Sequence, residues 1–77
     1  MKIEIGKFYG SSSNPLCVYL VTADNGQTVC ADAYGLFNTA YWNRGQKITD
    51  FNHIEKKLLK ELTNEQNKTI SRWIQQD

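Results

Sequence analysis

Leu16-Cys-Val-Tyr-Leu-Val-Thr-Ala23 and Thr28-Val-Cys-Ala-Asp-Ala-Tyr34 flank the turn Asp24-Asn-Gly-Gln27, and this hairpin decides the fold. Both flanking runs are rich in β-branched and aromatic residues, which favour strands. Asn-Gly is the preferred pair for a two-residue type I′ turn, because both central positions need a positive φ. We therefore expect a register in which Asp24 faces Gln27 and Val18 faces Ala33.

This register sorts the side chains of the hairpin into two faces. The apolar face is the predicted core: Leu16, Val18, Leu20, Thr22, Val29, Ala31 and Ala33. The other face is mixed, and its Tyr19 and Tyr34 form a candidate contact patch. Cys17 and Cys30 lie about 13 Å apart along the sheet in this register. A disulfide needs Cα atoms within about 7 Å, so the register predicts two free thiols.

The segments on either side of the hairpin contain further strand signals. Residues Lys2–Ile5 alternate polar and apolar, and Phe8 and Tyr9 can continue this strand past a bend at Gly6. The segment Gly10–Pro15 has the composition of a loop. Residues Thr39–Trp42 favour a strand, with a turn at Asn43–Gly45 and a return over Gln46–Ile48. The alternative for Leu36–Tyr41 is a pair of short helical turns.

The last third of the chain has helical periodicity. Phe51, Ile54, Leu58 and Leu62 form an apolar stripe after an N-cap at Thr49 or Asp50. The stripe is interrupted near Leu62, because Glu65 would fall on it. Thr63 and Gln66 have the spacing of a capping box for a second helix over about 64–75. That helix buries Ile70, Trp73 and Ile74.

These segments together predict one α+β domain over residues 1–77. Residues 1–48 form an antiparallel β-meander of three to four strands. Residues 49–77 form two short helices that pack on one face of the sheet. A chain of 77 residues has room for only a marginal core, and its exposed edge strand makes a homodimer plausible.

Composition and charge bear on the class of partner, the cellular location and the type of source organism. The formal net charge is +1, so the total charge does not point to a polyanionic partner. The start of the chain lacks the apolar core of a signal peptide, and no stretch reaches the length of a membrane span. We therefore expect a cytoplasmic protein without a membrane association. Seven Asn residues suggest an AT-rich coding sequence, typical of a low-GC bacterium or its phages.

The sequence shows no constellation of residues that would carry chemistry. His53 is the single histidine, and no serine or aspartate lies at a suggestive spacing from it. The cysteines and His53 lack the spacing of a metal site. The glycines match no nucleotide-binding fingerprint. We therefore predict no catalytic residue, no metal and no cofactor, and we expect a protein that is not an enzyme.

Aromatic and cationic residues are concentrated in the middle of the chain, and together with Tyr19 they predict a binding surface. The predicted partner-binding residues are Tyr19, Tyr34, Phe37, Tyr41, Trp42, Arg44 and Lys47. Aromatic residues and Arg are common interface hot spots. The first hypothesis is a non-enzymatic protein that binds another protein, for instance a phage or mobile-element inhibitor of a host defence or transcription protein. An inward-folded Trp42 is the structural alternative.

The same residue types also suit a nucleic-acid-binding regulator. Aromatic rings stack on single-stranded bases, while cations follow the phosphate backbone. Lys56 and Lys60 would extend such a surface along the predicted first helix. The low net charge disfavours this second hypothesis, because nucleic-acid-binding domains are usually basic.

Overall fold

The computed structural model describes residues 2–37, 42 and 44–75, together with the side chains of all of these except 52 and 75. Within these residues, five strands, one turn of 3₁₀ helix and one α-helix follow each other along the chain. In order they are β1 (Phe8–Ser11), β2 (Cys17–Asp24), β3 (Thr28–Leu36), β4 (Gly45–Glu55), η1 (Lys56–Leu58), β5 (Leu59–Glu61) and α1 (Asn64–Gln75).

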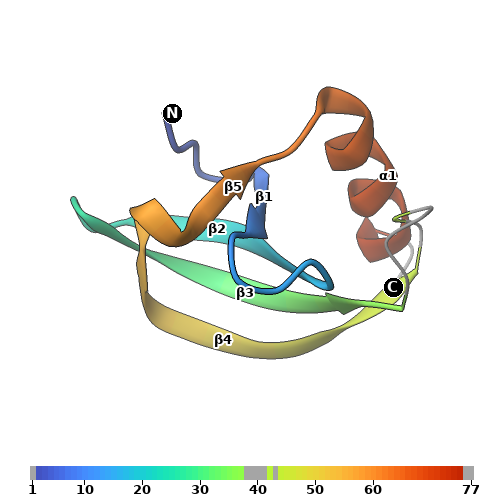
Figure 1. Ribbon diagram of the computed structural model, residues 1–77, viewed down its shortest axis with the longest axis horizontal. Helices are drawn as coiled ribbons and strands as arrows, with labels where there is room; N and C mark the ends of the chain where they lie inside the picture. Colours follow the sequence, from blue (N-terminus) through green and yellow to red (C-terminus); the bar gives the residue numbers. More distant parts are fainter. Residues whose placement is uncertain (1, 38–41, 43, 76–77) are drawn as a thin grey trace.

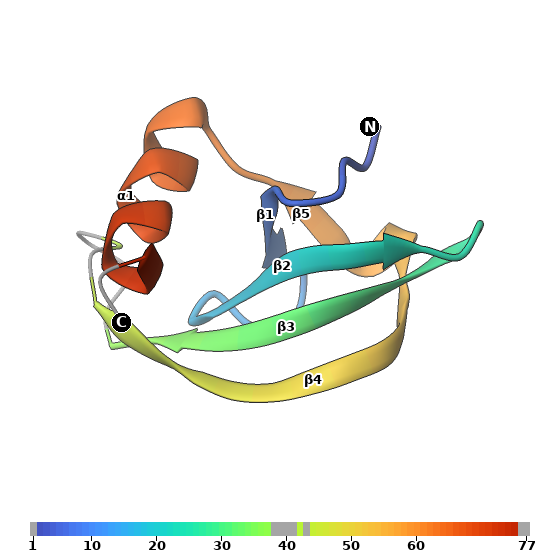
Figure 2. The same ribbon diagram turned by 180° about the vertical axis from the view of Figure 1, so that it is seen from behind.

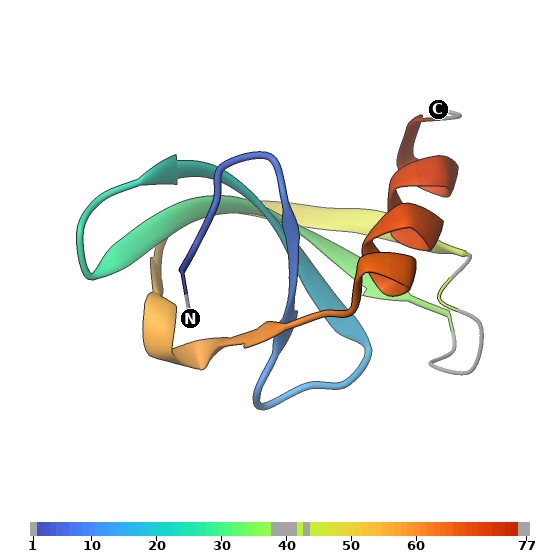
Figure 3. The same cartoon turned by 90° about the horizontal axis from the view of Figure 1, so that it is seen from above.

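The strands form one antiparallel sheet with the order β4-β3-β2-β1-β5. The sheet curls strongly, so that β4 and β5 lie on opposite sides of the molecule (Figures 1 and 2). Helix α1 lies beside the end of β3 and the start of β4, as Figure 3 shows from above. The predicted α+β class is confirmed. The predicted three to four strands and two helices are not exact, since the described residues form a sheet of five strands and a single α-helix follows it.

The hairpin forms, but its turn lies one residue later than predicted. Asn25 N donates to Thr28 O at 2.9 Å, which makes Gly26 and Gln27 the central residues of the turn. Gly26 has φ +93°, whereas Asn25 is not in the left-handed region. A glycine with positive φ at the first central position is the pattern of a type II′ turn. The Asp24 carboxylate stabilises this turn by accepting from Gly26 N at 3.0 Å.

A bulge next to the turn completes the change of register. The ladder shifts between Val21 and Ala23 of β2, so that Val18 pairs with Tyr34 and Tyr19 pairs with Ala33. A shift by one residue moves side chains to the opposite face of a strand. Tyr19 and Tyr34 therefore lie on opposite faces, and the predicted patch containing both is wrong. The single-faced core predicted for the hairpin is wrong for the same reason.

Each face of the sheet contributes side chains to one of two buried hydrophobic clusters. We call the first cluster the helix-side core, and it consists of Phe8, Val18, Leu36, Leu62 and Ile70. We call the second the strand core, and it consists of Tyr9, Val21, Val29, Ala31, Ile54 and Leu59. Strand β1 serves both cores, because its consecutive residues Phe8 and Tyr9 point to opposite faces.

The predicted first helix over residues 49–62 is wrong, because this segment forms most of β4, then η1 and β5. Phe51 pairs with Ala31, and Ile54 pairs with Val29. Their partners Ala31 and Val29 are two residues apart on β3, whereas Phe51 and Ile54 are three residues apart on β4. Strand β4 therefore has a bulge between Phe51 and Ile54. The bulge puts both side chains on one face and thereby reproduces the i, i+3 spacing of a helix. The division predicted at residue 48 falls inside β4.

The predicted second helix is confirmed as α1. Gln66 N donates to Thr63 Oγ1 at 3.1 Å, and Thr63 N donates to Gln66 Oε1 at 2.9 Å. These reciprocal bonds are the predicted capping box. Ile70 is fully buried, and Trp73 packs against the same helix-side core.

The remaining segments agree with the predictions in part. Strand pairing begins at Phe8, so Lys2–Ile5 lie outside the sheet, and Gly6 has a φ of +86° at the bend. The return strand over Gln46–Ile48 exists as part of β4. The predicted strand Thr39–Trp42 lies largely outside the described residues. Cys17 and Cys30 are both thiols rather than halves of a disulfide.

Candidate binding groove

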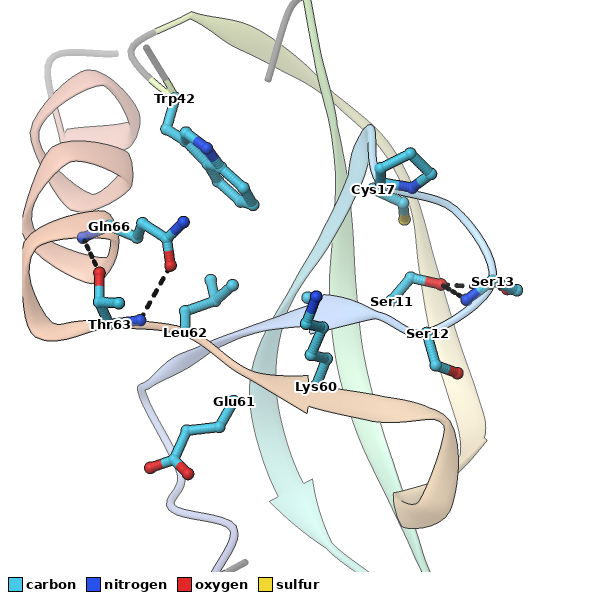
Figure 4. A pocket seen from close by; sticks show the side chains of 12 residues that line it. Ser11, Ser12, Ser13, Cys17, Trp42, Lys60, Glu61, Leu62, Thr63 and Gln66 are labelled. Carbon is cyan, nitrogen blue, oxygen red and sulfur yellow. Dashed lines mark hydrogen bonds between the residues drawn. The ribbon is translucent and has the colours of Figure 1, made fainter. Parts of the chain in front are cut away.

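A groove of about 460 Å³ opens between the β1–β2 loop and the segment that leads from β5 into α1. Figure 4 shows the groove with the side chains that line it. Its residues are Gly10, Ser11, Ser12, Ser13, Pro15, Cys17, Trp42, Lys60, Glu61, Leu62, Thr63 and Gln66. The volume falls in the range of about 300–1,000 Å³ that is usual for ligand sites. Of the predicted binding residues, the structure brings Trp42 and Lys60 together here.

Trp42 is held in an unusual backbone conformation. Its φ is +57°, and it is the sole non-glycine residue with a positive φ in the described part of the chain. A bulky residue in this region costs about 1–2 kcal/mol relative to the ordinary conformations. Trp73 Nε1 secures it by donating to Trp42 O at 3.0 Å. The indole is half-buried against the helix-side core, which includes Leu62, as the alternative of an inward-folded Trp42 predicts, and it also lines the groove (Figure 4).

The β1–β2 loop forms a wall with its own hydrogen bonds. Ser11 is buried, and its Oγ accepts from Ser13 N and Asn14 N, each at 3.2 Å. Asn14 Oδ1 in turn accepts from Leu16 N at 3.0 Å. Because these bonds are local, the serine-rich loop has a defined shape without a large core of its own.

The opposite wall is fixed by the start of α1. The Gln66 side chain that lines the groove is engaged in the capping box with Thr63. Next to Gln66 on the helix, Asn67 Oδ1 accepts from Phe8 N at 2.9 Å and ties α1 to β1. The groove therefore lies between two walls that are both anchored on β1.

The charges in the groove point in different directions. Lys60 extends along the groove, whereas the Glu61 carboxylate points away from it (Figure 4). No carboxylate of the described residues forms an ion pair with Lys60. The ammonium group of Lys60 is therefore the charged group that is oriented along the groove.

The other predicted lysines are engaged in ion pairs. Lys56 Nζ lies 2.9 Å and 3.0 Å from the two Asp24 carboxylate oxygens. This contact, with help from the Gly26 N–H, lowers the pKa of Asp24. Lys47 Nζ lies 2.9 Å from an Asp50 oxygen and 3.8 Å from an Asp32 oxygen.

The Lys47 cluster shifts the pKa values of its members in different directions. The hydrogen bond from Lys47 lowers the pKa of Asp50, and the same bond raises the pKa of Lys47. Burial is the main cause that raises the pKa of Asp32, and the neighbouring Asp50 adds to it. The pKa values of these two neighbouring carboxyl groups are therefore shifted in opposite directions.

The predicted aromatic residues outside the groove are distributed over several places. Tyr34 packs edge-to-face with Phe8 at 6.2 Å and with Trp73 at 5.8 Å, so it belongs to the packing under α1. The ring of Phe37 is exposed, and Cζ of the Arg44 guanidinium group lies 5.8 Å from the centroid of this ring. Tyr41 lies outside the described residues.

Tyr19 lines a separate shallow depression of about 360 Å³ with Phe51 and Leu58. Its ring packs edge-to-face with Phe51 at 6.1 Å. Burial raises the pKa of Tyr19, and the nearby Cys17 adds to the increase, while a hydrogen bond with Ser11 opposes it. This tyrosine therefore lies on a different surface from Trp42 and Lys60.

The sequence pattern does not identify Leu62 or the serines of the β1–β2 loop as groove residues. The apolar stripe predicts that Leu62 faces a helix core. The composition of Gly10-Ser-Ser-Ser-Asn-Pro15 predicts only a loop, although three consecutive hydroxyl groups are a signal for a polar wall.

Comparison with known proteins returns no matching family model, no matching curated protein and no matching solved structure. Within the part of the chain that the structure describes, no helix has the length and apolar character to cross a membrane. The same residues contain no cluster of three or more side chains suited to hold a metal ion.

Proposed function

We propose that this chain is a non-enzymatic binding module that recognises another protein through the groove beside Trp42. The observation that carries the proposal is the conformation of Trp42, whose left-handed backbone places the indole in the groove. Strained residues that the surrounding structure holds in place are often found at functional sites. Tryptophan is also one of the residue types that are enriched at interface hot spots.

The placement of reactive side chains supports a non-enzymatic role. His53, the single histidine of the chain, lines depressions with Glu55 and does not line the groove. Cys17 and the serines line the groove instead. The described residues of the groove therefore place no histidine beside Cys17 or the serines, although histidine is the most common base for such a nucleophile. Inhibition of a host defence or transcription protein is the particular role that we propose for such a module.

The experiment is selection of peptides from a random display library on the immobilised protein, followed by affinity measurement. We expect Trp42→Ala to lose binding at least tenfold while urea unfolding stays cooperative. Phe37→Ala is the matched control, because it removes an exposed aromatic ring outside the groove. Equal binding by wild type and Trp42→Ala, or equal loss in both variants, would remove the groove as the docking site.

A nucleic-acid-binding regulator is the second proposal, and the Phe37–Arg44 contact favours it. An exposed ring with a guanidinium group against it can stack on a single-stranded base. Lys47 and Lys56 are occupied by carboxylates, which weakens the proposal. Nuclease treatment during affinity capture from host lysate distinguishes the two functions. Enrichment that vanishes with nuclease would favour the nucleic acid.

A further inference from the structure

This inference rests on the proposed function, and it concerns the chemistry of the segment that the groove accepts. The floor of the groove is apolar around Trp42 and Leu62. Gly10 lets Leu62 pack closely against β1 at this floor, because a Cβ at that position would lie 3.2 Å from Leu62 Cδ2 and 3.7 Å from Lys60 Cβ.

The electrostatics of the groove are one-sided. Lys60 has no carboxylate within 4.0 Å among the described residues, and the same is true of Lys2 and Lys68, but only Lys60 of these three lines the groove. Glu61 lines the groove but directs its carboxylate away from it (Figure 4). A ligand therefore meets an uncompensated ammonium group next to an apolar floor. A charge-assisted hydrogen bond beside an apolar contact is stronger than one in open solvent.

We propose that the groove recognises a short acidic peptide segment that places an apolar side chain against Trp42 and Leu62 and a carboxylate on Lys60 Nζ. The volume of about 460 Å³ holds a few side chains and does not hold a folded domain. Ser12 also lines the groove, and its hydroxyl group can bond the peptide backbone.

A nucleic-acid strand fits these observations less well than a peptide. Each nucleotide brings a phosphate, so a strand needs several cations along its path. Lys60 is the single cation among the described residues that line the groove. The neighbouring wall from Ser11 to Ser13 is neutral, and its Ser11 hydroxyl is already bonded within the loop.

The test compares peptides selected from a random display library on wild type and on Lys60→Glu. We expect wild type to enrich peptides with Asp or Glu next to an apolar residue. A synthetic peptide of that kind should bind Lys60→Glu at least about tenfold more weakly, the loss typical of one charge-assisted bond. Lys68→Glu is the matched control, because it makes the same change at a position on α1 that does not line the groove. That control should bind like wild type.

The outcomes separate this inference from the proposed function. Selected peptides without acidic bias, or equal affinity of wild type and Lys60→Glu, would overturn the inference while Trp42-dependent binding still supports the groove. Failure to select any peptide, or binding that Trp42→Ala leaves unchanged, would overturn both. Binding of an oligothymidine that Lys60→Glu abolishes, with no peptide selected, would replace the peptide by a nucleic acid.

Discussion

Gly45→Ala is the substitution for which the structure gives the sharpest expectation. A Cβ at Gly45 would lie 2.3 Å from the backbone oxygen of Gly35 and 3.0 Å from Trp73 Cη2. Side-chain carbons essentially never come within 3.0 Å of such atoms, so the backbone must move by more than half an ångström. Gly45 pairs with Leu36, which belongs to the helix-side core. The movement would therefore disturb both the β3–β4 ladder and the packing of α1.

Gly35→Ala is the matched control for this substitution. A Cβ at Gly35 would meet the Cδ1 atom of Ile48 at 3.1 Å, and that side chain is 59% exposed and can turn away. Both substitutions lower the entropy of the unfolded chain by the same amount. This term cancels in their difference. What remains is the overpacking at Gly45, about 1–3 kcal/mol of unfolding free energy.

Urea unfolding followed by far-ultraviolet circular dichroism measures this difference. We expect Gly45→Ala to unfold at a lower urea concentration than Gly35→Ala, with an unchanged slope. In thermal unfolding, each kcal/mol corresponds to about 4–8 °C for a domain of this size. Equal midpoints for the two variants would refute the reasoning, because they would show that the Gly35 oxygen can move at no cost.

Three further predictions concern the helix, the core and the pH dependence. Thr63→Ala should cost about 1 kcal/mol in urea unfolding, because it removes the capping bond to Gln66 N, whereas Thr63→Ser should be close to wild type. Ile70→Ala should cost about 2–5 kcal/mol, since this side chain is fully buried, and a loss below about 1 kcal/mol would contradict the packing of α1. At pH 7, the free energy of unfolding of Asp32→Asn should be equal to that of wild type or up to about 0.5 kcal/mol higher. The reason is that burial raises the pKa of Asp32 and so disfavours its charged form. As the pH falls through that raised pKa, wild type gains stability relative to Asp32→Asn, so the advantage of the variant should shrink; an advantage that grows in acid would contradict the assignment.

The parts of the fold that local chemistry determines are predictable from the sequence. Helix α1 and its capping box depend on residues within one turn of each other, so the spacing of Thr63 and Gln66 is enough to assign them. The hairpin is predictable as an element, but its register is not. Gly26 and Asn25 allow two adjacent turns, and the turn that forms is paired with a bulge near Thr22.

The error over residues 49–62 has a different cause. A bulged strand places residues three apart on one face, so the spacing of Phe51 and Ile54 does not distinguish it from a helix. The long pairing of β4 with β3 decides the outcome, and that pairing is not visible in the local pattern. The groove is not predictable as a whole, because Trp42, Lys60 and the serines come from distant parts of the chain. Residue type alone points to Trp42 and Lys60 but does not place them together.

The pairing of β1 with β5 has a consequence for the order of folding. Tyr9 pairs with Glu61, and α1 follows β5 to supply Ile70 to the helix-side core. Until residues 59–75 take these places, the outer edge of β1 and one apolar face of the sheet have no cover. An uncovered strand edge is a template for pairing with another chain. A folding intermediate that has not yet added this segment is therefore a candidate client for chaperones.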